Sequence, residues 1–188
     1  MREGKEYEAA LLGQVKRSAY GRELLLNNKD NPEIKENFLR YAVQPSMTIE
    51  FFEETHFSFE KAVKMVKNSQ PWEDPHHPKK EFTILLMDKL SKESGVPREC
   101  IYYYTGVESA LDRFHNVDYF IIFKIGDKEE LVKVDITMDP NKPTNNADLI
   151  LVYKKDILEN RQSMNEFVEE SFHSIVNQVI YRQKKARY

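Results

Sequence analysis

Two aspartates, Asp118 and Asp135, lie in a stretch of sequence that is otherwise rich in Ile, Phe and Val. The segment 116–137, NVDYFIIFKIGDKEELVKVDIT, reads as two strands around a tight turn at 126–127. Counting outward from this turn places Asp118 opposite Asp135 on one face of the hairpin. Two carboxylates held that close repel each other, and a divalent cation between them removes the repulsion. The pair therefore predicts a metal site.

The prediction depends on the register of the hairpin. It assumes that Ile125 pairs with Lys128, which brings Tyr119 opposite Val134. A slip of one residue would send the two acids to opposite faces. Solvated aspartates at the ends of strands would also give this sequence pattern, so the metal site and a plain strand end both stay open.

The neighbours of the two acids separate into two kinds. Lys133 and Thr137 lie two residues from Asp135 and so share its face of the strand. The opposite face is predicted to be a clean apolar core face, made of Val117, Tyr119, Ile121, Phe123, Val132, Val134 and Ile136.

A short helix predicted over VESALDRF, just before the first strand, adds two more acids. Glu108 and Asp112 are four residues apart and therefore lie on one helical face. Either could complete a metal site. Thr105 with Glu108 also matches a capping box, which would explain Glu108 without any metal.

The arrangement of a helix acid, an aspartate at a strand start and an acid on the next strand resembles the PD-(D/E)xK nuclease superfamily. The residues that carry the resemblance are GVESALDRFHNVDYFI and LVKVDIT, within about residues 100–155. The resemblance implies that Asp118 is the central metal ligand and Asp135 the first residue of the (D/E)xK element. It implies that Glu108, or Asp112, is the helix acid.

The family's lysine position falls on Thr137, which cannot supply a lysine's charge. Lys133 on the same face, or Lys142 from the following loop, could substitute. The resemblance further implies a mixed sheet flanked by helices, dependence on Mg²⁺ or Mn²⁺, and hydrolysis of phosphodiester bonds in nucleic acid, with DNA favoured over RNA. It allows a homodimer. It also implies the alternative of a fold that has lost its catalysis and serves as an interaction module.

The elements that must position these residues form an α/β domain with a helical first half. Residues 1–95 are predicted to be a mostly helical elaboration, and 96–188 an α/β core that ends in a long helix. Helical stripes cover residues 5–20, 31–41, 58–68 and 79–94.

Strands are expected at 100–106, 117–125, 130–137 and 147–153, the last within the strand-like segment 147–158, ADLILVYKKDIL. Ser163 with Glu166 resembles a capping box that would open the final helix, 164–185. The histidines of the loop 69–78, His76 and His77, are adjacent and Pro-flanked, and we expect them on the surface. The tyrosines at 102–104 could stack on bases, although strand alternation would bury part of them.

Composition excludes several classes of protein. The 188 residues carry a net charge of −3, so any affinity for nucleic acid must come from local patches. Charged residues make up 31% and no long apolar run occurs, so we expect no membrane span. Cys100 is the only cysteine, which excludes an internal disulfide and favours a reducing, cytoplasmic setting. The sequence thus predicts a metal-dependent nuclease or its inactive relative.

Overall fold

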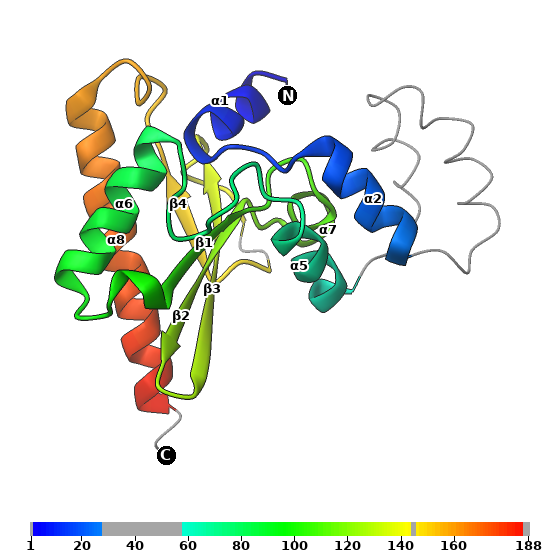
Figure 1. Cartoon of the computed structure of the whole chain (residues 1–188). Helices are drawn as coiled ribbons and strands as arrows, with labels where there is room; N and C mark the ends of the chain where they lie inside the picture. Colours follow the sequence, from blue (N-terminus) through cyan, green and yellow to red (C-terminus); the bar gives the residue numbers. More distant parts are fainter. Residues whose placement is uncertain (1, 28–57, 144–145, 186–188) are drawn as a thin grey trace.

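Four strands form one mixed sheet at the centre of the molecule, in the order β1-β2-β3-β4 (Figure 1). The computed structural model describes residues 2–27, 58–143 and 146–185. The strands are β1 (Ile101–Thr105), β2 (Tyr119–Ile125), β3 (Lys128–Thr137) and β4 (Leu149–Val152). The helices are α1 (Arg2–Leu12), α2 (Arg17–Asn27), α5 (Phe59–Lys67), α6 (Glu81–Glu93), α7 (Ala110–His115) and α8 (Arg161–Lys185), with a short 3₁₀ turn η2 (Arg98–Cys100) before β1. The fold is of the mixed α/β class, as predicted.

The predicted register of the hairpin is confirmed. Strands β2 and β3 pair antiparallel from Ile125 opposite Lys128 to Tyr119 opposite Val134. Strand β1 lies antiparallel on the other side of β2, and β4 lies parallel to β3. Because the regular pairing stops at Tyr119 and Val134, Asp118 directly precedes β2 whereas Asp135 lies within β3.

Both faces of the sheet are covered, which corrects the prediction of a single core face. On one face α6 and α8 pack against alternate strand residues such as Tyr103, Tyr119 and Ile121 (Figure 1). On the other face α5 and α7 cover Phe120 and Ile122, both fully or nearly fully buried. A strand buried on both sides has no polar alternation, which is why β2 reads as an unbroken apolar run.

The first predicted helix is divided in two at Gly13. This residue has φ +72°, a left-handed conformation that ends α1 and that glycine adopts without strain. A β-carbon on Gly13 would lie 2.8 Å from the Trp72 ring, so glycine is also required there by space. The helix predicted at 31–41 falls outside the described residues.

Capping explains where other helices start. Ser58 caps α5 as predicted, since its hydroxyl accepts a hydrogen bond from the Lys61 amide. The predicted start of the final helix at Ser163 is wrong. α8 begins at Arg161, because the Asn160 side chain accepts hydrogen bonds from the amides of Gln162 and Ser163.

The loop between α5 and α6 covers the outer edge of β1. The Tyr103 amide donates to the Pro75 carbonyl, and the Thr105 amide donates to the side-chain carbonyl of Gln70. A ring nitrogen of His76 lies 2.9 Å from the Ile101 carbonyl oxygen. This part of the loop, predicted to lie on the surface, therefore also completes the hydrogen bonds of an edge strand.

Within the part of the chain that the structure describes, no helix is both long enough and apolar enough to cross a membrane.

Candidate active site

Asp118 is buried at the point where the chain enters β2. Only 3% of its surface is exposed. One carboxylate oxygen accepts a 2.7 Å hydrogen bond from the amide of Ile136 on β3, and its backbone carbonyl accepts one from the Gly106 amide. These bonds fix the side chain of Asp118 against β3 and its backbone against the turn that follows β1.

Asp135 is equally buried and is paired with a lysine. It is 1% exposed. Lys142, from the loop that follows β3, brings its Nζ within 2.8 Å of one carboxylate oxygen and 2.7 Å of the other. Lys142 is therefore the lysine that contacts the predicted (D/E)xK aspartate.

Two further acids, one from α7 and one from α1, interact electrostatically with this pair. Asp112 lies 3.7 Å from the ammonium of Lys5 and accepts a hydrogen bond from the Glu108 amide. Glu8 of α1 is repelled by Asp112 and Asp135 and attracted by Lys5 and Lys142. We call the four residues Glu8, Asp112, Asp118 and Asp135 the acid cluster.

Three members of the acid cluster, Glu8, Asp112 and Asp118, hold their protons more tightly than free carboxyl groups do. Burial, and then repulsion from Asp112, Glu8 and Asp135, raise the pKa of Asp118 well above its ordinary value, against the opposing effect of the Ile136 amide. Burial also raises the pKa of Asp112. Burial and the nearby Asp112 raise the pKa of Glu8 to about 7. Gathering these acids in one place costs free energy whenever they are ionised.

Lys142 supplies part of the missing positive charge. Burial lowers the pKa of its ammonium, but the hydrogen bond to Asp135 and the charges of Asp118 and Glu8 outweigh this and raise it. Lys142 therefore stays protonated next to the acids. It is a cation held against Asp135 by two short contacts.

Glu108, the predicted helix acid, is directed elsewhere. Its carboxylate accepts two hydrogen bonds from the Arg17 guanidinium, at 3.1 and 3.0 Å. The capping-box alternative is also wrong, because Ser109 caps α7 and Glu108 precedes the helix in a left-handed conformation. The helix acid that interacts with Asp118 is Asp112.

Lys133, the strand residue that could substitute for the family's lysine, contacts groups other than Asp135. Its ammonium lies 3.7 Å from Asp148 and stands over the ring of Phe59. The loop residue Lys142, and not the strand residue Lys133, is the one that reaches Asp135.

Comparisons of this chain with protein-family models, curated proteins and solved structures found no match.

The donor chemistry of the acid cluster suits Mg²⁺ or Mn²⁺, since both prefer carboxylate oxygens. As the side chains stand, however, no three acidic, His or Cys residues among those described are arranged to hold a metal ion. The ammonium groups of Lys142 and Lys5 lie against Asp135 and Asp112 instead. Metal binding would require Lys142 to release at least one oxygen of Asp135.

Sequence reasoning missed Glu8 altogether. It lies more than one hundred residues before Asp118. The pattern of its helix shows only an apolar stripe, with charged residues between the apolar ones. A faint signal was present, because Glu8 is four residues from Leu12 and so shares the face that α1 buries. An acid on a buried face is unusual enough to mark a candidate.

Proposed function

We propose that this chain is a metal-dependent nuclease that hydrolyses phosphodiester bonds in nucleic acid, DNA more than RNA. The observation that carries the proposal is the acid cluster together with Lys142 at the end of the β2–β3 hairpin. Four carboxylates gathered in a largely buried place are costly, and a site that binds a divalent cation is a functional reason to keep them.

Asp118 and Asp135 would hold Mg²⁺ or Mn²⁺, with Asp112 or Glu8 closing the shell. The bound cation would supply Lewis acidity and lower the pKa of a water molecule. Lys142 would neutralise negative charge on the phosphate, the work that the family's lysine does and Thr137 cannot do. The mixed sheet flanked by helices agrees with what the PD-(D/E)xK resemblance implies.

A second candidate function has its own observation. Lys142 and Lys5 already pair with Asp135 and Asp112, and this arrangement neutralises much of the cluster without a metal. A nuclease-like fold that has lost its chemistry and serves as an interaction module would look the same. A cytoplasmic location, which the single cysteine favours, belongs to either proposal.

The experiment that separates the two is a calorimetric titration with Mn²⁺, joined to a cleavage assay on plasmid DNA and on RNA. We expect Asp118→Asn and Asp135→Asn each to abolish both Mn²⁺ binding and cleavage. Asp127→Asn, at the opposite end of the same hairpin, is the matched control and should change neither.

Asp118→Asn should remain folded, so a loss of Mn²⁺ binding or cleavage would not be due to unfolding. In Asp118→Asn the new amide oxygen could still accept the Ile136 hydrogen bond, and the cluster would lose one charge. The variant should therefore unfold at the same or a higher urea concentration than the wild type in EDTA. Cleavage by Asp118→Asn at the wild-type rate would overturn the assignment. If the wild type gives no heat of binding in the Mn²⁺ titration, the interaction module is favoured.

A further inference from the structure

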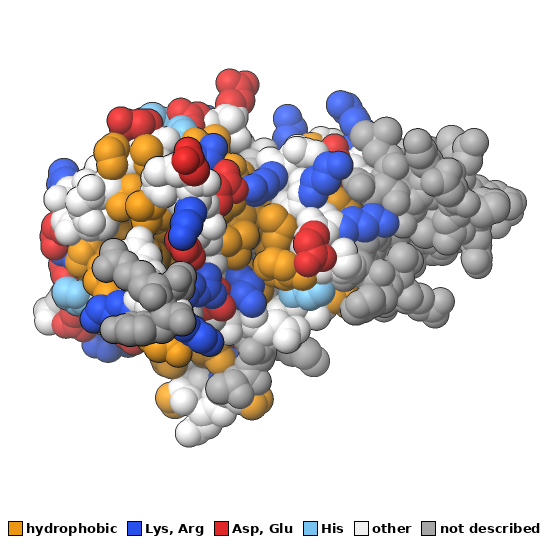
Figure 2. Space-filling model, turned by 90° about the horizontal axis from the view of Figure 1, so that it is seen from below, with side chains coloured by type: hydrophobic (Ala, Val, Ile, Leu, Met, Phe, Trp, Pro, Cys, Tyr) orange, Lys and Arg blue, Asp and Glu red, His pale blue; other side chains and the backbone are white. Residues whose placement is uncertain are grey.

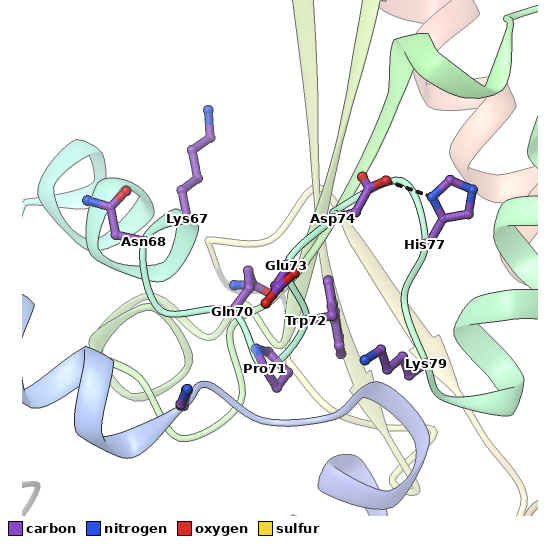
Figure 3. A pocket seen from close by; sticks show the side chains of 10 residues that line it. Lys67, Asn68, Gln70, Pro71, Trp72, Glu73, Asp74, His77 and Lys79 are labelled. Carbon is purple, nitrogen blue, oxygen red and sulfur yellow. Dashed lines mark hydrogen bonds and ion pairs between the residues drawn. The ribbon is translucent and has the colours of Figure 1, made fainter.

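A hollow of about 650 Å³ opens beside Trp72, at the end of α5 and along the loop that follows it (Figure 3). Three lysines from three segments line it: Lys16 between α1 and α2, Lys67 in the last turn of α5, and Lys79 just before α6. None of its lining residues belongs to the acid cluster. The hollow is therefore a second, separate feature of the surface.

The described residues supply no carboxylate partner to the three lysines of the hollow. Across residues 2–27, 58–143 and 146–185, the structure records no ion pair for Lys16, Lys67 or Lys79, whereas Lys89, Lys142 and Lys154 are each paired with an acid. The ammonium of Lys67 stands 5.7 Å from the centre of the Tyr104 ring, which orients it without cancelling its charge. Figure 2 shows Lys and Arg side chains spread over the face that it views, among acidic and hydrophobic ones.

Two acids also line the hollow, and one of them is already engaged. Asp74 accepts hydrogen bonds from the His76 amide at 2.8 Å and from the His77 ring at 2.7 Å, the latter drawn as a dashed line in Figure 3. Glu73 is exposed and has no such partner among the described residues. Three lysines and one carboxylate without such a partner, Glu73, thus line the hollow. In Figure 3 the Lys67 side chain extends away from Glu73 and Trp72.

The rim of the hollow is held by buried hydrogen bonds. The Lys16 amide donates to the Ser69 carbonyl at 2.6 Å, and the fully buried Ser69 hydroxyl donates to the Met65 carbonyl at 2.7 Å. The Trp72 ring packs against Gly13. The lysines are therefore presented from a framework that is formed before any ligand arrives, which reduces the entropy cost of binding.

We propose that this hollow binds the phosphate group of a nucleotide or of a nucleic-acid strand. Lysine ammonium groups are point-charge donors to phosphate oxygens, and Trp72 with Pro71 provides an apolar wall beside them. The volume is sufficient for a phosphate together with the sugar or base attached to it.

Trp72 is the only tryptophan of the chain, so its fluorescence reports on the hollow directly. The test is a fluorescence titration in EDTA with pyrophosphate, AMP and a ten-residue oligothymidylate in separate arms. EDTA removes divalent metal, so the result does not depend on the acid cluster or on cleavage. We expect a saturable change in Trp72 emission. AMP acting as well as the oligonucleotide identifies a mononucleotide site, and a response to the oligonucleotide alone identifies a strand.

Variants make the assignment specific. Lys16→Ala with Lys79→Ala should weaken binding about tenfold or more, because each removes a charged donor. Lys92→Ala, an exposed lysine of α6, is the control and should leave binding unchanged. Glu73→Gln should tighten binding. No emission change with any of the three ligands, or equal weakening by Lys92→Ala, would overturn the proposal.

Discussion

The contact between Lys142 and Asp135 decides whether the acid cluster can bind a metal ion. The carboxylate is almost completely buried, whereas 31% of the lysine side chain is exposed. A cation that enters the cluster must compete with this ammonium group for the same two oxygens. The Lys142 ammonium therefore either occupies the Asp135 oxygens until a metal ion displaces it, or neutralises Asp135 permanently in place of a metal ion.

Lys142→Met tests which of these holds. Leaving Asp135 without its partner should lower the free energy of unfolding in EDTA by about 1–3 kcal/mol, less than for a fully buried pair because the lysine is partly solvated. The variant should bind Mn²⁺ more tightly than the wild type, since the competing ammonium is gone, yet cleave no DNA.

Urea unfolding, Mn²⁺ calorimetry and the plasmid assay check the three parts of this prediction. Lys133→Met is the matched control, because Lys133 pairs with Asp148 and not with the cluster. If Lys142→Met cleaves normally while Lys133→Met does not, the lysine roles are reversed from those proposed.

At the scale of elements, the turn between β1 and α7 holds Asp118 in place. Gly106 donates its amide to the Asp118 carbonyl at 2.6 Å, and an added β-carbon would lie 2.5 Å from the Val117 carbonyl oxygen. That oxygen belongs to the backbone and cannot turn aside as a flexible side chain would. The approach of these two segments therefore requires glycine.

Gly106→Ala should consequently destabilise the protein by about 1–3 kcal/mol and weaken Mn²⁺ binding by displacing Asp118. Gly4→Ala in α1 is the control. No atom lies within 4 Å of its β-carbon position, so alanine there should stabilise the helix by about 0.5–1 kcal/mol. Urea unfolding of both variants measures the difference in the free energy of unfolding. A Gly106→Ala protein as stable as the wild type would contradict so close an approach of the two backbones.

The hairpin was predictable from the sequence because its signals are local. A Gly-Asp turn at 126–127 sets the register, and that register is the one observed. The break at Gly13 was harder to predict, since a glycine inside a helical stripe is tolerated, and its left-handed φ and its contact with the Trp72 ring are seen only in the folded chain. The strand-like segment 147–158 forms a shorter strand, because β4 ends at Val152 and a turn follows at 155–159.

The site was predictable only in part, for the same reason. Asp118, Asp135 and Asp112 lie within 24 residues of one another and are brought together by adjoining elements. Glu8 and Lys5 arrive from α1, and no spacing rule connects them to the hairpin. Glu108 had the right residue type and position, but its backbone conformation turns it towards Arg17, which the sequence does not reveal.

At the scale of the whole molecule, the acid cluster makes stability depend on pH. The pKa of Glu8 is raised to about 7, and those of Asp112 and Asp118 are raised as well, so the folded state binds protons that the unfolded chain releases. Stability from Glu8 is fully present below its ordinary pKa near 4.5 and is lost as the pH rises through 7.

We therefore expect the metal-free protein to become less stable between pH 4.5 and about pH 7, the interval between the ordinary and the raised pKa of Glu8. Glu8→Gln should flatten this decline, whereas Glu159→Gln, an exposed acid, should not. Urea unfolding in EDTA across the pH range measures both. Added Mn²⁺ should stabilise the wild type increasingly as the pH rises, because deprotonation frees carboxylate oxygens. A Glu8→Gln profile that is parallel to the wild type would contradict the pKa assigned to Glu8.

The loop over β1 has a consequence for how copies of this chain could associate. The Tyr103 and Thr105 amides already donate hydrogen bonds to Pro75 and Gln70. At these positions β1 therefore has no free backbone donor for an incoming strand. At the other edge of the sheet, the structure records no comparable cover over β4 among the residues it describes. If two molecules pair edge strands to form one continuous β-sheet, the pairing strand would be β4.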